Sequence, residues 1–320
     1  MIIFVPINLL YRQGVNNQEK YRLSILIPVY NYVCTELVDS LHRQAEASGL
    51  EYEIIVADDG SDNNAVKDTN SSIGCLTHCR YISRSANTGR AAIRNFLAAQ
   101  SRFEHLLFLD CDIRLPDGNF LQRYAQCGGG AVVYGGVRTA DMASSPGRGN
   151  IRYVYERAAE PHHTARERGK RPYKSFRTTN FLIRRDIMLD CPFDERFRHY
   201  GYEDVFFGKS LKHRGITINH IDNPVLIADY EPNHVFVAKT EEALRTLHRF
   251  RNDLAGYSSM LERVGNMGRF MPMGIFRIWH RLFGKWELAN LKGNRPRLFV
   301  FNIYRLGYYL SLDDNHEDNP

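Results

Sequence analysis

The stretch that decides the fold is residues 23–61, LSILIPVYNYVCTELVDSLHRQAEASGLEYEIIVADDGS. It contains two β-rich apolar runs, at residues 23–29 and 53–57, and a helical pattern between them over residues 34–48 that ends at Gly49. A strand, a helix and a second strand in this order predict a βαβ unit, whose parallel strands are buried on both faces. The sequence therefore predicts an α/β fold with a mainly parallel sheet and helices on both faces.

The pattern repeats along the next part of the chain. Apolar runs at residues 79–84 and 105–110 predict a third and a fourth strand, with a helix between them that ends near Gln100. Each of the last three strands ends in polar residues, at positions 58–61, 86–89 and 110–112. Because ligands bind beyond the carboxyl ends of strands in such sheets, we expect these residues to meet at one edge.

The remaining sequence predicts further strands and then a change to helices. Strands are expected at residues 128–137, 178–185 and 216–221, and helices at residues 203–213, 239–263 and 274–291. We therefore expect three parts, namely an N-terminal extension (1–22), a catalytic sheet domain (23–235) and a C-terminal helical extension with an acidic tail (236–320).

Composition narrows the class of protein. The chain has 320 residues, 43% of them hydrophobic and 24% charged, which suits a folded body with a full core. No apolar run reaches the roughly 18 residues of a membrane span, and the start MIIFVPINLLYR lacks the features of a secretory signal. The six cysteines lack zinc-site spacing. We expect a cytoplasmic protein with reduced cysteines.

Asp110 and Asp112 have the spacing of a metal-binding pair. In an extended strand, residues two apart point to the same side, so both carboxylates can bind one cation. Mg²⁺ or Mn²⁺, held by one or two carboxylates and by phosphate oxygens, is the usual partner of a nucleotide diphosphate. The alternative for an isolated Asp-x-Asp is a solvated loop after a strand.

Asp59 is a candidate for recognition of a nucleobase. Its carboxylate can accept the imide hydrogen of uracil, a donor that cytosine lacks, while Pro28, Tyr30 and Asn31 offer an aromatic face and backbone groups. A simple Asp-Gly turn is the alternative interpretation. The turn at Asn87, with Arg94 in the helix that follows, offers donors for an anion.

Glu203 and Asp204 open a helix whose next turn is apolar, which holds the two acids at the edge of the domain. One carboxylate can orient a sugar hydroxyl while the other takes its proton as a general base. Acids in a first turn also stabilise the helix dipole, and this alone can explain the pair.

Five motifs in order resemble those of glycosyltransferase family 2 with the GT-A fold, over about residues 23–231. The motifs are Pro28-Val29-Tyr30-Asn31, Asp58-Asp59-Gly60-Ser61, Asn87-Thr88-Gly89 with Arg94-Asn95, Leu109-Asp110-Cys111-Asp112 and Gly201-Tyr202-Glu203-Asp204. The resemblance implies that Pro28, Tyr30 and Asp59 hold the base, that Arg94 lies near the diphosphate, and that Asp110 lies at the ribose and metal. It also implies that Asp112 is a metal ligand, that Asp204 is the base of an inverting transfer, and that Thr179-Asn180 lines the acceptor side.

One feature departs from the family pattern. Many relatives carry a histidine soon after an Asn-Pro pair, and this histidine completes the metal site. Here Asn223-Pro224 is followed by Val225, Leu226 and Ile227. A third ligand can then come from His234, from Asp229 or from water, and His234 is our candidate.

Two basic regions invite further hypotheses. Residues 138–177 carry ten Lys or Arg against four acids. This segment suits a lid that closes over the diphosphate or over an anionic acceptor, and the alternative is a solvated helix. In residues 274–291, apolar and aromatic side chains share one helical face, which suits a membrane interface, the catalytic domain or a second subunit of a homodimer. No nucleic-acid-binding motif accompanies the net charge of +6, so nucleic acid is not an expected partner.

The leading hypothesis is an inverting glycosyltransferase that uses a UDP-sugar with Mn²⁺ or Mg²⁺. Its acceptor would be a glycan or lipid-linked saccharide in surface polysaccharide synthesis, such as that of a capsule, at the inner face of the cytoplasmic membrane. Two alternatives are a sugar nucleotidyltransferase, against which the Glu203-Asp204 element argues, and a scaffold that binds sugar nucleotides without catalysis.

Overall fold

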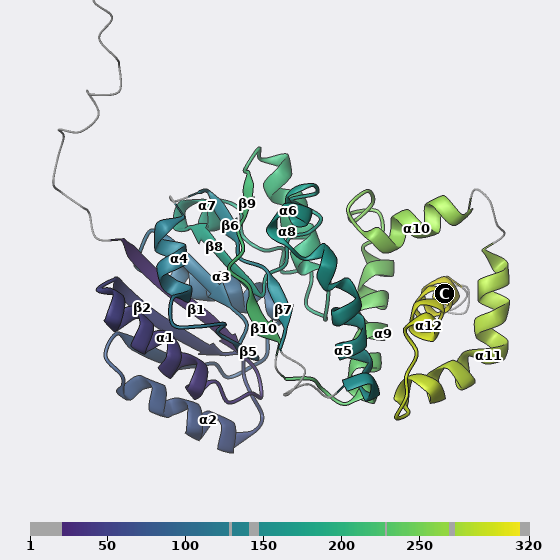
Figure 1. Cartoon of the computed structure of the whole chain (residues 1–320), viewed down its shortest axis with the longest axis horizontal. Coiled ribbons are helices and arrows are strands. Elements are labelled where there is room, and N and C mark those ends of the chain that lie inside the picture. Colours follow the sequence, from purple (N-terminus) through teal and green to yellow (C-terminus); the bar gives the residue numbers. More distant parts are fainter. Residues whose placement is uncertain (1–20, 128–129, 141–146, 228, 269–272, 314–320) are drawn as a thin grey trace, which may run out of the picture.

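The computed structural model describes residues 21–127, 130–140, 147–227, 229–268 and 273–313. The expected N-terminal extension and acidic tail therefore lie almost wholly outside the described residues. Figure 1 shows two layers along the long axis of the molecule: a sheet domain with its covering helices, and a group of helices near the C-terminus.

The main sheet has seven strands in the order β3-β2-β1-β4-β8-β6-β9, and β8 is antiparallel to its two neighbours β4 and β6. A three-stranded sheet in the order β5-β10-β7 lies beside it. The strands are β1 (Arg22–Val29), β2 (Glu51–Asp58), β3 (Cys79–Ser83), β4 (His105–Leu109), β5 (Ile113–Arg114), β6 (Val132–Tyr134), β7 (Val137–Thr139), β8 (Asn180–Arg184), β9 (Ile218–His220) and β10 (Val225–Ile227). The predicted mainly parallel α/β sheet is confirmed.

Helices cover both faces of the main sheet and form the second layer. They are α1 (Thr35–Ser48), α2 (Asn64–Ser71), α3 (Arg90–Gln100), α4 (Phe120–Gln126), α5 (Ile151–Ala159), α6 (Ala165–Gly169), α7 (Arg185–Asp190), α8 (Glu203–His213), α9 (Asn233–Arg249), α10 (Ser259–Gly268), α11 (Gly274–Lys292) and α12 (Leu298–Ser311). Short 3₁₀ turns occur at residues 72–75, 147–149 and 160–162.

Alternation along the strands explains the two covered faces. Ile25 and Ile27 of β1 pack into the core beneath α1 and α4, while Leu26 packs into the core beneath α3, α7 and α8. Both faces of the strand are buried, so its sequence is a nearly continuous apolar run. In the parallel register Val29 pairs with Asp58, which brings the polar ends of β1 and β2 to the same edge.

Three sequence expectations about element boundaries differ from the structure. The strand expected at residues 128–137 is divided into β6 and β7, which belong to different sheets, because the chain turns at Gly136 with a φ of 94°. The helix expected at residues 239–263 begins earlier and is broken between α9 and α10, where Gly256 has a φ of 75° and Phe250 turns into the core. The strand expected at residues 216–221 is shorter, at Ile218–His220.

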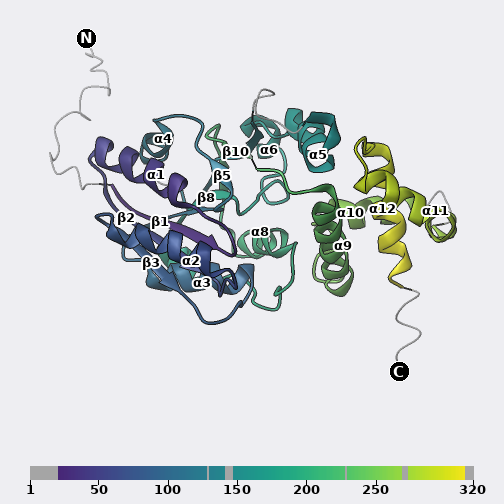
Figure 2. The same cartoon turned by 90° about the horizontal axis from the view of Figure 1, so that it is seen from below.

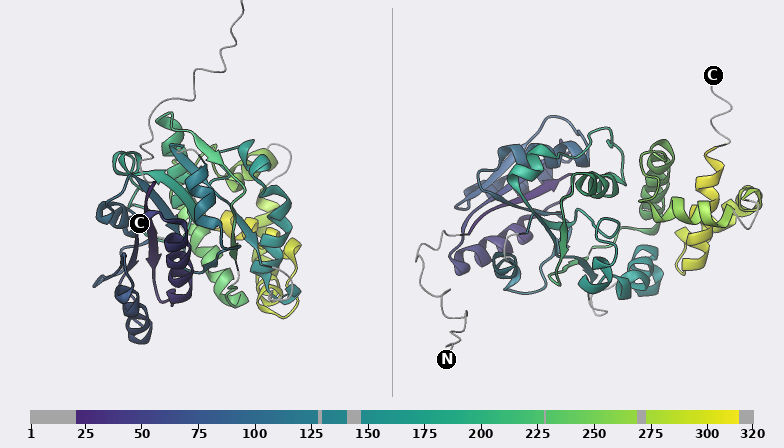
Figure 3. Two further views of the ribbon diagram at one scale, coloured as in Figure 1. Left: turned by 60° about the vertical axis from the view of Figure 1, so that its left-hand side comes forward. Right: turned by 90° about the horizontal axis from the view of Figure 1, so that it is seen from above.

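The helical layer consists of α9 to α12 and packs on the sheet domain through α5 and α8. One of its cores joins α8, α9, α10 and α12, and the other joins α5, α9, α11 and α12. Figure 2 and the right-hand view of Figure 3 show this layer at the end of the molecule opposite β2 and β3. Helix α11 forms its outer edge in Figures 1 and 2. Among the described helices, none combines the length and apolar character needed to cross a membrane.

Candidate active site

Asp59 holds the loop that follows β3. Its carboxylate accepts hydrogen bonds from the backbone N–H groups of Thr88 (3.1 Å) and Gly89 (2.9 Å) and from the Thr88 hydroxyl (2.8 Å). Arg84 lies 3.2 Å from the same carboxylate. Asp59 is only 3% exposed, and its hydrogen bonds fix the conformation of this loop. Recognition of a base by Asp59 stays a prediction.

The other residues expected to bind the nucleoside do gather beside Asp59. Pro28, Tyr30, Asn31 and Asn87 line one cavity of about 460 Å³ at the carboxyl edge of the sheet, which we call the donor cavity. Tyr30 is 47% exposed, so its ring is free to contact a ligand. Asn31 has a φ of 52°, and its side-chain oxygen accepts from the backbone N–H groups of residues 62 and 63 at 3.2 Å. The structure thus brings these residues together at one edge of the sheet, as the sequence predicted.

Arg94 lines the donor cavity, but its guanidinium is bound to carboxylates of the protein. It is 1% exposed, and its guanidinium donates to the Asp110 carboxylate at 2.7 Å and lies 3.6 Å from that of Glu203. Its Nη1 also donates to the backbone oxygen of Arg90 at 3.1 Å. Arg94 therefore ties the end of β4 to the start of α8. Contact of Arg94 with a diphosphate stays a prediction.

Glu203 and Asp204 have different environments at the start of α8. Glu203 is 5% exposed and lies against Arg94 and, at 3.9 Å, Arg90. Asp204 lines the neighbouring cavity, and its carboxylate accepts from the backbone N–H of Val205 at 2.7 Å. Burial and the adjacent Glu203 carboxylate raise the pKa of Asp204 to about 6. The role of Asp204 or Glu203 as a general base stays a prediction.

Asp112 fits a cation site in its chemistry. Burial and the neighbouring Asp110 carboxylate raise the pKa of Asp112, and Arg152 and Arg90 oppose this rise. Repulsion between two carboxylates falls when a divalent cation lies between them, and Mg²⁺ and Mn²⁺ prefer such hard oxygen ligands. The two residues present therefore fit a metal that takes its other ligands from phosphate oxygens or water.

The structure does not bring His234 to these carboxylates. His234 is exposed near the start of α9 and does not line either cavity that contains Asp112 and Asp110. Asp229 shares a third cavity with Asp112. Within the described part of the chain, no three His, Cys, Asp or Glu side chains form a metal-binding group. A third protein ligand stays a prediction, and Asp229 is better placed for it than His234.

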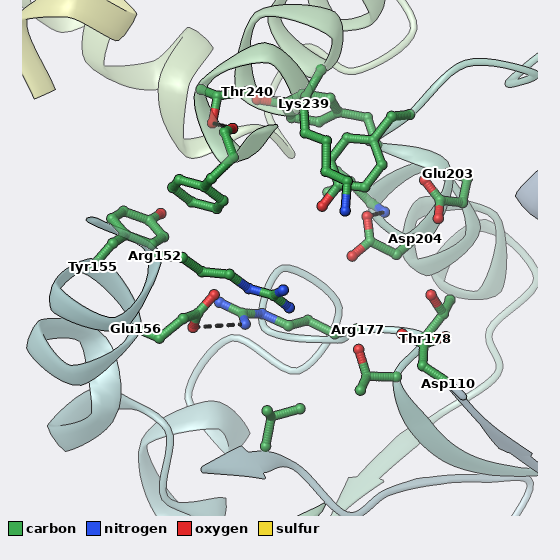
Figure 4. Close-up of a pocket in the computed structure, with 18 of the residues that line it drawn as sticks. Asp110, Arg152, Tyr155, Glu156, Arg177, Thr178, Glu203, Asp204, Lys239 and Thr240 are labelled. Carbon is green, nitrogen blue, oxygen red and sulfur yellow. Dashed lines mark hydrogen bonds and ion pairs between the residues drawn. The ribbon is translucent and has the colours of Figure 1, made fainter. Parts of the chain in front are cut away.

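A second cavity, of about 360 Å³, lies between the sheet domain and the helical layer, and we call it the transfer cavity. Figure 4 shows Asp204 and Asp110 on one side of it, Tyr155 and Glu156 on the other, and Lys239 entering from α9. The two cavities share five lining residues: Arg90, Asp110, Asp112, Tyr200 and Lys239. A ligand can therefore extend from the donor cavity past the carboxylates towards Asp204.

Several residues of the transfer cavity were not identified from the sequence motifs. Arg152 pairs with Glu231 and lies 4.0 Å from Asp112, while Arg177 pairs with Glu156 at 3.2 Å. Lys239 lies 3.2 Å from Glu231. The basic composition of residues 138–177 was a usable signal for both arginines, but nothing in the sequence marked Lys239.

Of the two residues expected to line the acceptor side, Thr179 and Asn180, the structure places only Thr179 at the transfer cavity. Thr178 and Thr179 line the transfer cavity. Asn180, in contrast, is fully buried, and its amide donates to the backbone oxygens of Gly136 and Asn223 at 2.9 Å. Asn180 therefore joins β8 to the smaller sheet.

The fold and the site define an α/β enzyme that holds acidic side chains between a donor cavity and a transfer cavity. The sequence profile described as "Glycosyl transferase family 2" matches residues 24–191. This is more than half of the chain, which therefore belongs to that family and is a glycosyltransferase. No curated protein matches the chain in sequence.

Two solved structures share the fold over nearly the whole chain. S. aureus TarS 1–349 is 15% identical with a TM-score of 0.50, and the match covers 93% of this chain and 92% of that one. The mannosyltransferase PcManGT from Pyrobaculum calidifontis, solved with GDP-Man and Mn²⁺, is 11% identical with a TM-score of 0.55 and coverage of 94% and 89%. Both matches extend beyond the residues of the family profile, so the fold that is shared with TarS and PcManGT includes the C-terminal helices.

Proposed function

We propose that this glycosyltransferase inverts the anomeric centre of a UDP-sugar and that Asp204 is its general base. The observation that carries the proposal is the position of Asp204, next to the carboxylates shared by the donor and transfer cavities. With a pKa of about 6, Asp204 is ionised near neutral pH and basic enough to take a proton from a sugar hydroxyl. Glu203, which is held by Arg94, positions the start of α8.

The residues around Asp204 each have a part in this proposal. Asp110 and Asp112 would hold Mn²⁺ or Mg²⁺, which neutralises charge on the leaving diphosphate when it is bound. Arg90 and Lys239, which line both cavities, are placed to bind phosphate oxygens. Tyr30 and Asp59 would hold the base. PcManGT was solved with GDP-Man and Mn²⁺, which supports a nucleotide sugar and a metal for this chain, but the base is our inference from Asp59.

The acceptor proposed is a hydroxyl of a glycan or lipid-linked saccharide in surface polysaccharide synthesis, as in a capsule. The outer face of α11 supports contact with a membrane. It exposes six large apolar side chains, between 41% and 69%, at Ile275, Ile278, Trp279, Leu282, Phe283 and Trp286. Because the opposite side of α11 buries Glu287 and Leu291 against α12, the helix does not dock this apolar face on the sheet domain. A second copy of the chain is the competing occupant.

The first experiment measures binding and hydrolysis of UDP-, GDP- and dTDP-sugars, with and without Mn²⁺. We expect metal-dependent release of UDP from one sugar by the parent protein. Asp112→Ala should abolish this release and weaken Mn²⁺ binding, whereas Asp39→Ala, an exposed carboxylate on α1, should change neither. Asp204→Asn should lose transfer while it keeps donor binding.

Other outcomes favour the competing functions. Release of diphosphate from a nucleoside triphosphate in the presence of a sugar phosphate would indicate a nucleotidyltransferase. Binding of a nucleotide sugar without turnover in the parent, together with indifference to Asp204→Asn, would indicate a scaffold. Failure to bind any nucleotide sugar under every metal condition would refute the proposed function.

A further inference from the structure

One cation of the transfer cavity lacks an acidic partner. Five cations line this cavity, and within the described residues four of them lie within 4 Å of a carboxylate: Arg90, Arg152, Arg177 and Lys239. Among the described residues, the fifth cation, Arg305 of α12, has a single hydrogen-bond partner, the Tyr155 hydroxyl at 3.5 Å. Its Nε is buried and has no hydrogen-bond partner among the described residues. A guanidinium has five N–H donors, so most of the capacity of Arg305 is unused.

The surroundings of Arg305 are aromatic. Its guanidinium lies 5.5 Å from the ring centre of Tyr155 and 5.4 Å from that of Phe301. Phe236 lies 5.5 Å from Phe301, and all four side chains line the transfer cavity. They come from α5, α9 and α12, three helices far apart in the sequence. We call Tyr155, Phe236, Phe301 and Arg305 the helical wall.

The helical wall belongs to the acceptor side of the enzyme. None of its four residues lines the donor cavity, where Tyr30 and Asp59 lie. The wall and Asp204 line the same cavity, so a saccharide can contact both. Aromatic rings suit the apolar face of a sugar ring, and a guanidinium suits carboxylate or phosphate oxygens with a bidentate geometry. A neutral sugar would leave the guanidinium without a partner.

We propose that the helical wall is an acceptor subsite for a sugar with an anionic substituent, and that Arg305 binds this substituent. The inference rests on the proposed function and names the acceptor class of the same site. A uronic acid and a sugar phosphate both carry the required chemistry. Arg305 thus selects acceptors by charge at a distance from the reacting hydroxyl.

The test measures binding of three probes by saturation-transfer NMR: methyl β-glucoside, methyl β-glucuronide and glucose 6-phosphate. Mn²⁺ and the nucleoside diphosphate selected by the donor panel are present in saturating amounts, so that the donor cavity is filled. We expect one or both anionic probes to bind at least about tenfold more tightly than the neutral one. The anionic probe that binds more tightly shows whether the acceptor carries a carboxylate or a phosphate.

Variants separate the charge of Arg305 from its packing. Arg305→Gln should abolish the preference for anionic probes. Arg305→Lys should keep part of it, because lysine has the positive charge but not the two parallel N–H donors of the guanidinium. Arg263→Gln, which removes an exposed cation of α10, should leave the preference intact. Thermal unfolding of each variant checks that the fold is kept.

Two failures have different meanings. If the parent does not bind the nucleoside diphosphate, the proposed function itself fails. If the parent binds it but shows no preference for anionic probes, or if Arg305→Gln keeps that preference, the acceptor subsite is overturned while the glycosyltransferase assignment stands.

Discussion

At the scale of single residues, the side chain of Asp204 combines two opposing demands. As the proposed general base it must be ionised, but burial and the adjacent Glu203 carboxylate both disfavour its charge. A backbone hydrogen bond from Val205 and the positive charges of Arg177 and Arg94 partly offset this cost. The result is a carboxylate that is more basic than an exposed one, as a general base near neutral pH requires.

The raised pKa of Asp204 predicts effects of opposite sign on stability and activity. The pKa is about 6 in the folded protein and 3.8 in the unfolded chain, so the fold loses stability as the pH rises from about 3.8 to about 6, and the full loss is present above pH 6. Asp204→Asn should therefore raise the free energy of unfolding at pH 7.5 by about 1–3 kcal/mol while it abolishes transfer. Urea denaturation measures the first effect, with Asp39→Asn as the control.

The same group sets the acid side of the pH profile. In the parent, kcat/KM should fall about tenfold for each pH unit below about 6, because protonation removes the base. As the pH falls from 6 towards 4, the stability difference between the parent and Asp204→Asn should shrink. A rate that is flat from pH 7 to pH 5 would exclude Asp204 as the titrating base.

At the scale of elements, the loop between β2 and α2 depends on a glycine. Gly60 has a φ of 72°, and a Cβ there would lie 2.4 Å from the backbone carbon of Ala86 and 2.6 Å from the nitrogen of Asn87. The close contact of these two loops gives the donor cavity its shape. Gly49, at the end of α1, has a similar φ of 64° but nothing within 4 Å of its would-be Cβ.

This contrast gives a matched pair of variants. Gly60→Ala should lower the free energy of unfolding by about 2–5 kcal/mol, because a left-handed backbone and a clash with main-chain atoms add together. Gly49→Ala carries only the backbone cost of about 1–2 kcal/mol. Equal losses in denaturant titrations of the two variants would show that the contact with the Ala86–Asn87 backbone is unimportant.

The elements of the sheet domain were predictable because their signals are local. The apolar runs of β1 and β2, and the aspartates that follow β2 and β4, can be read from adjacent residues. The break between α9 and α10 was missed because Phe250 turns into a core formed by distant helices. The burial of Arg94 was missed for the same kind of reason, since its partner Glu203 lies more than 100 positions away.

Helix α5 shows what the sequence left open about the site. The basic composition of residues 138–177 indicated a role near the diphosphate or acceptor, but it gave no means of choosing among ten cations. In the structure Arg152 pairs with Glu231 and lies 4.0 Å from Asp112. Its positive charge lies where a metal and a diphosphate are proposed to bind.

The position of Arg152 predicts opposite effects on two ligands. Without the donor, Arg152→Gln should bind Mn²⁺ at least about twofold more tightly, because a cation that repels the metal is removed. The same variant should bind the nucleoside diphosphate about tenfold more weakly. Titration by electron paramagnetic resonance measures the first effect and calorimetry the second. Arg157→Gln, on the same helix but away from Asp112, is the control, and a fall in both affinities would indicate general disruption.

At the scale of the whole molecule, the helical layer has two functional sides. Its inner side supplies α9 and α12 to the transfer cavity, and its outer edge is α11 with the exposed apolar face (Figure 1). Arg281 and Lys285 are exposed beside that face, while Glu287, the acid of this helix, is buried and accepts a hydrogen bond from Trp279 at 2.8 Å. Apolar and aromatic groups beside cations complement an anionic lipid surface better than a neutral one.

This arrangement predicts binding to anionic vesicles. The parent should sediment with vesicles that contain 30% phosphatidylglycerol and far less with pure phosphatidylcholine, and rising salt should weaken the binding. Leu282→Asp should abolish sedimentation because it places a charge at the centre of the apolar face, where Leu282 is 69% exposed. Leu189→Asp, which changes a 44% exposed leucine on α7, is the matched control and should bind like the parent.

The same variants decide between a lipid surface and a second copy of the chain. If α11 meets a membrane, the parent is a monomer in solution. Leu282→Asp then changes neither its oligomeric state nor its hydrolysis of the donor, since no residue of α11 lines the donor cavity or the transfer cavity. If α11 pairs with its own copy, light scattering gives a dimer that Leu282→Asp converts to a monomer, without vesicle binding by the parent. Only the first pattern places the transfer cavity beside a membrane from which a lipid-linked acceptor can enter.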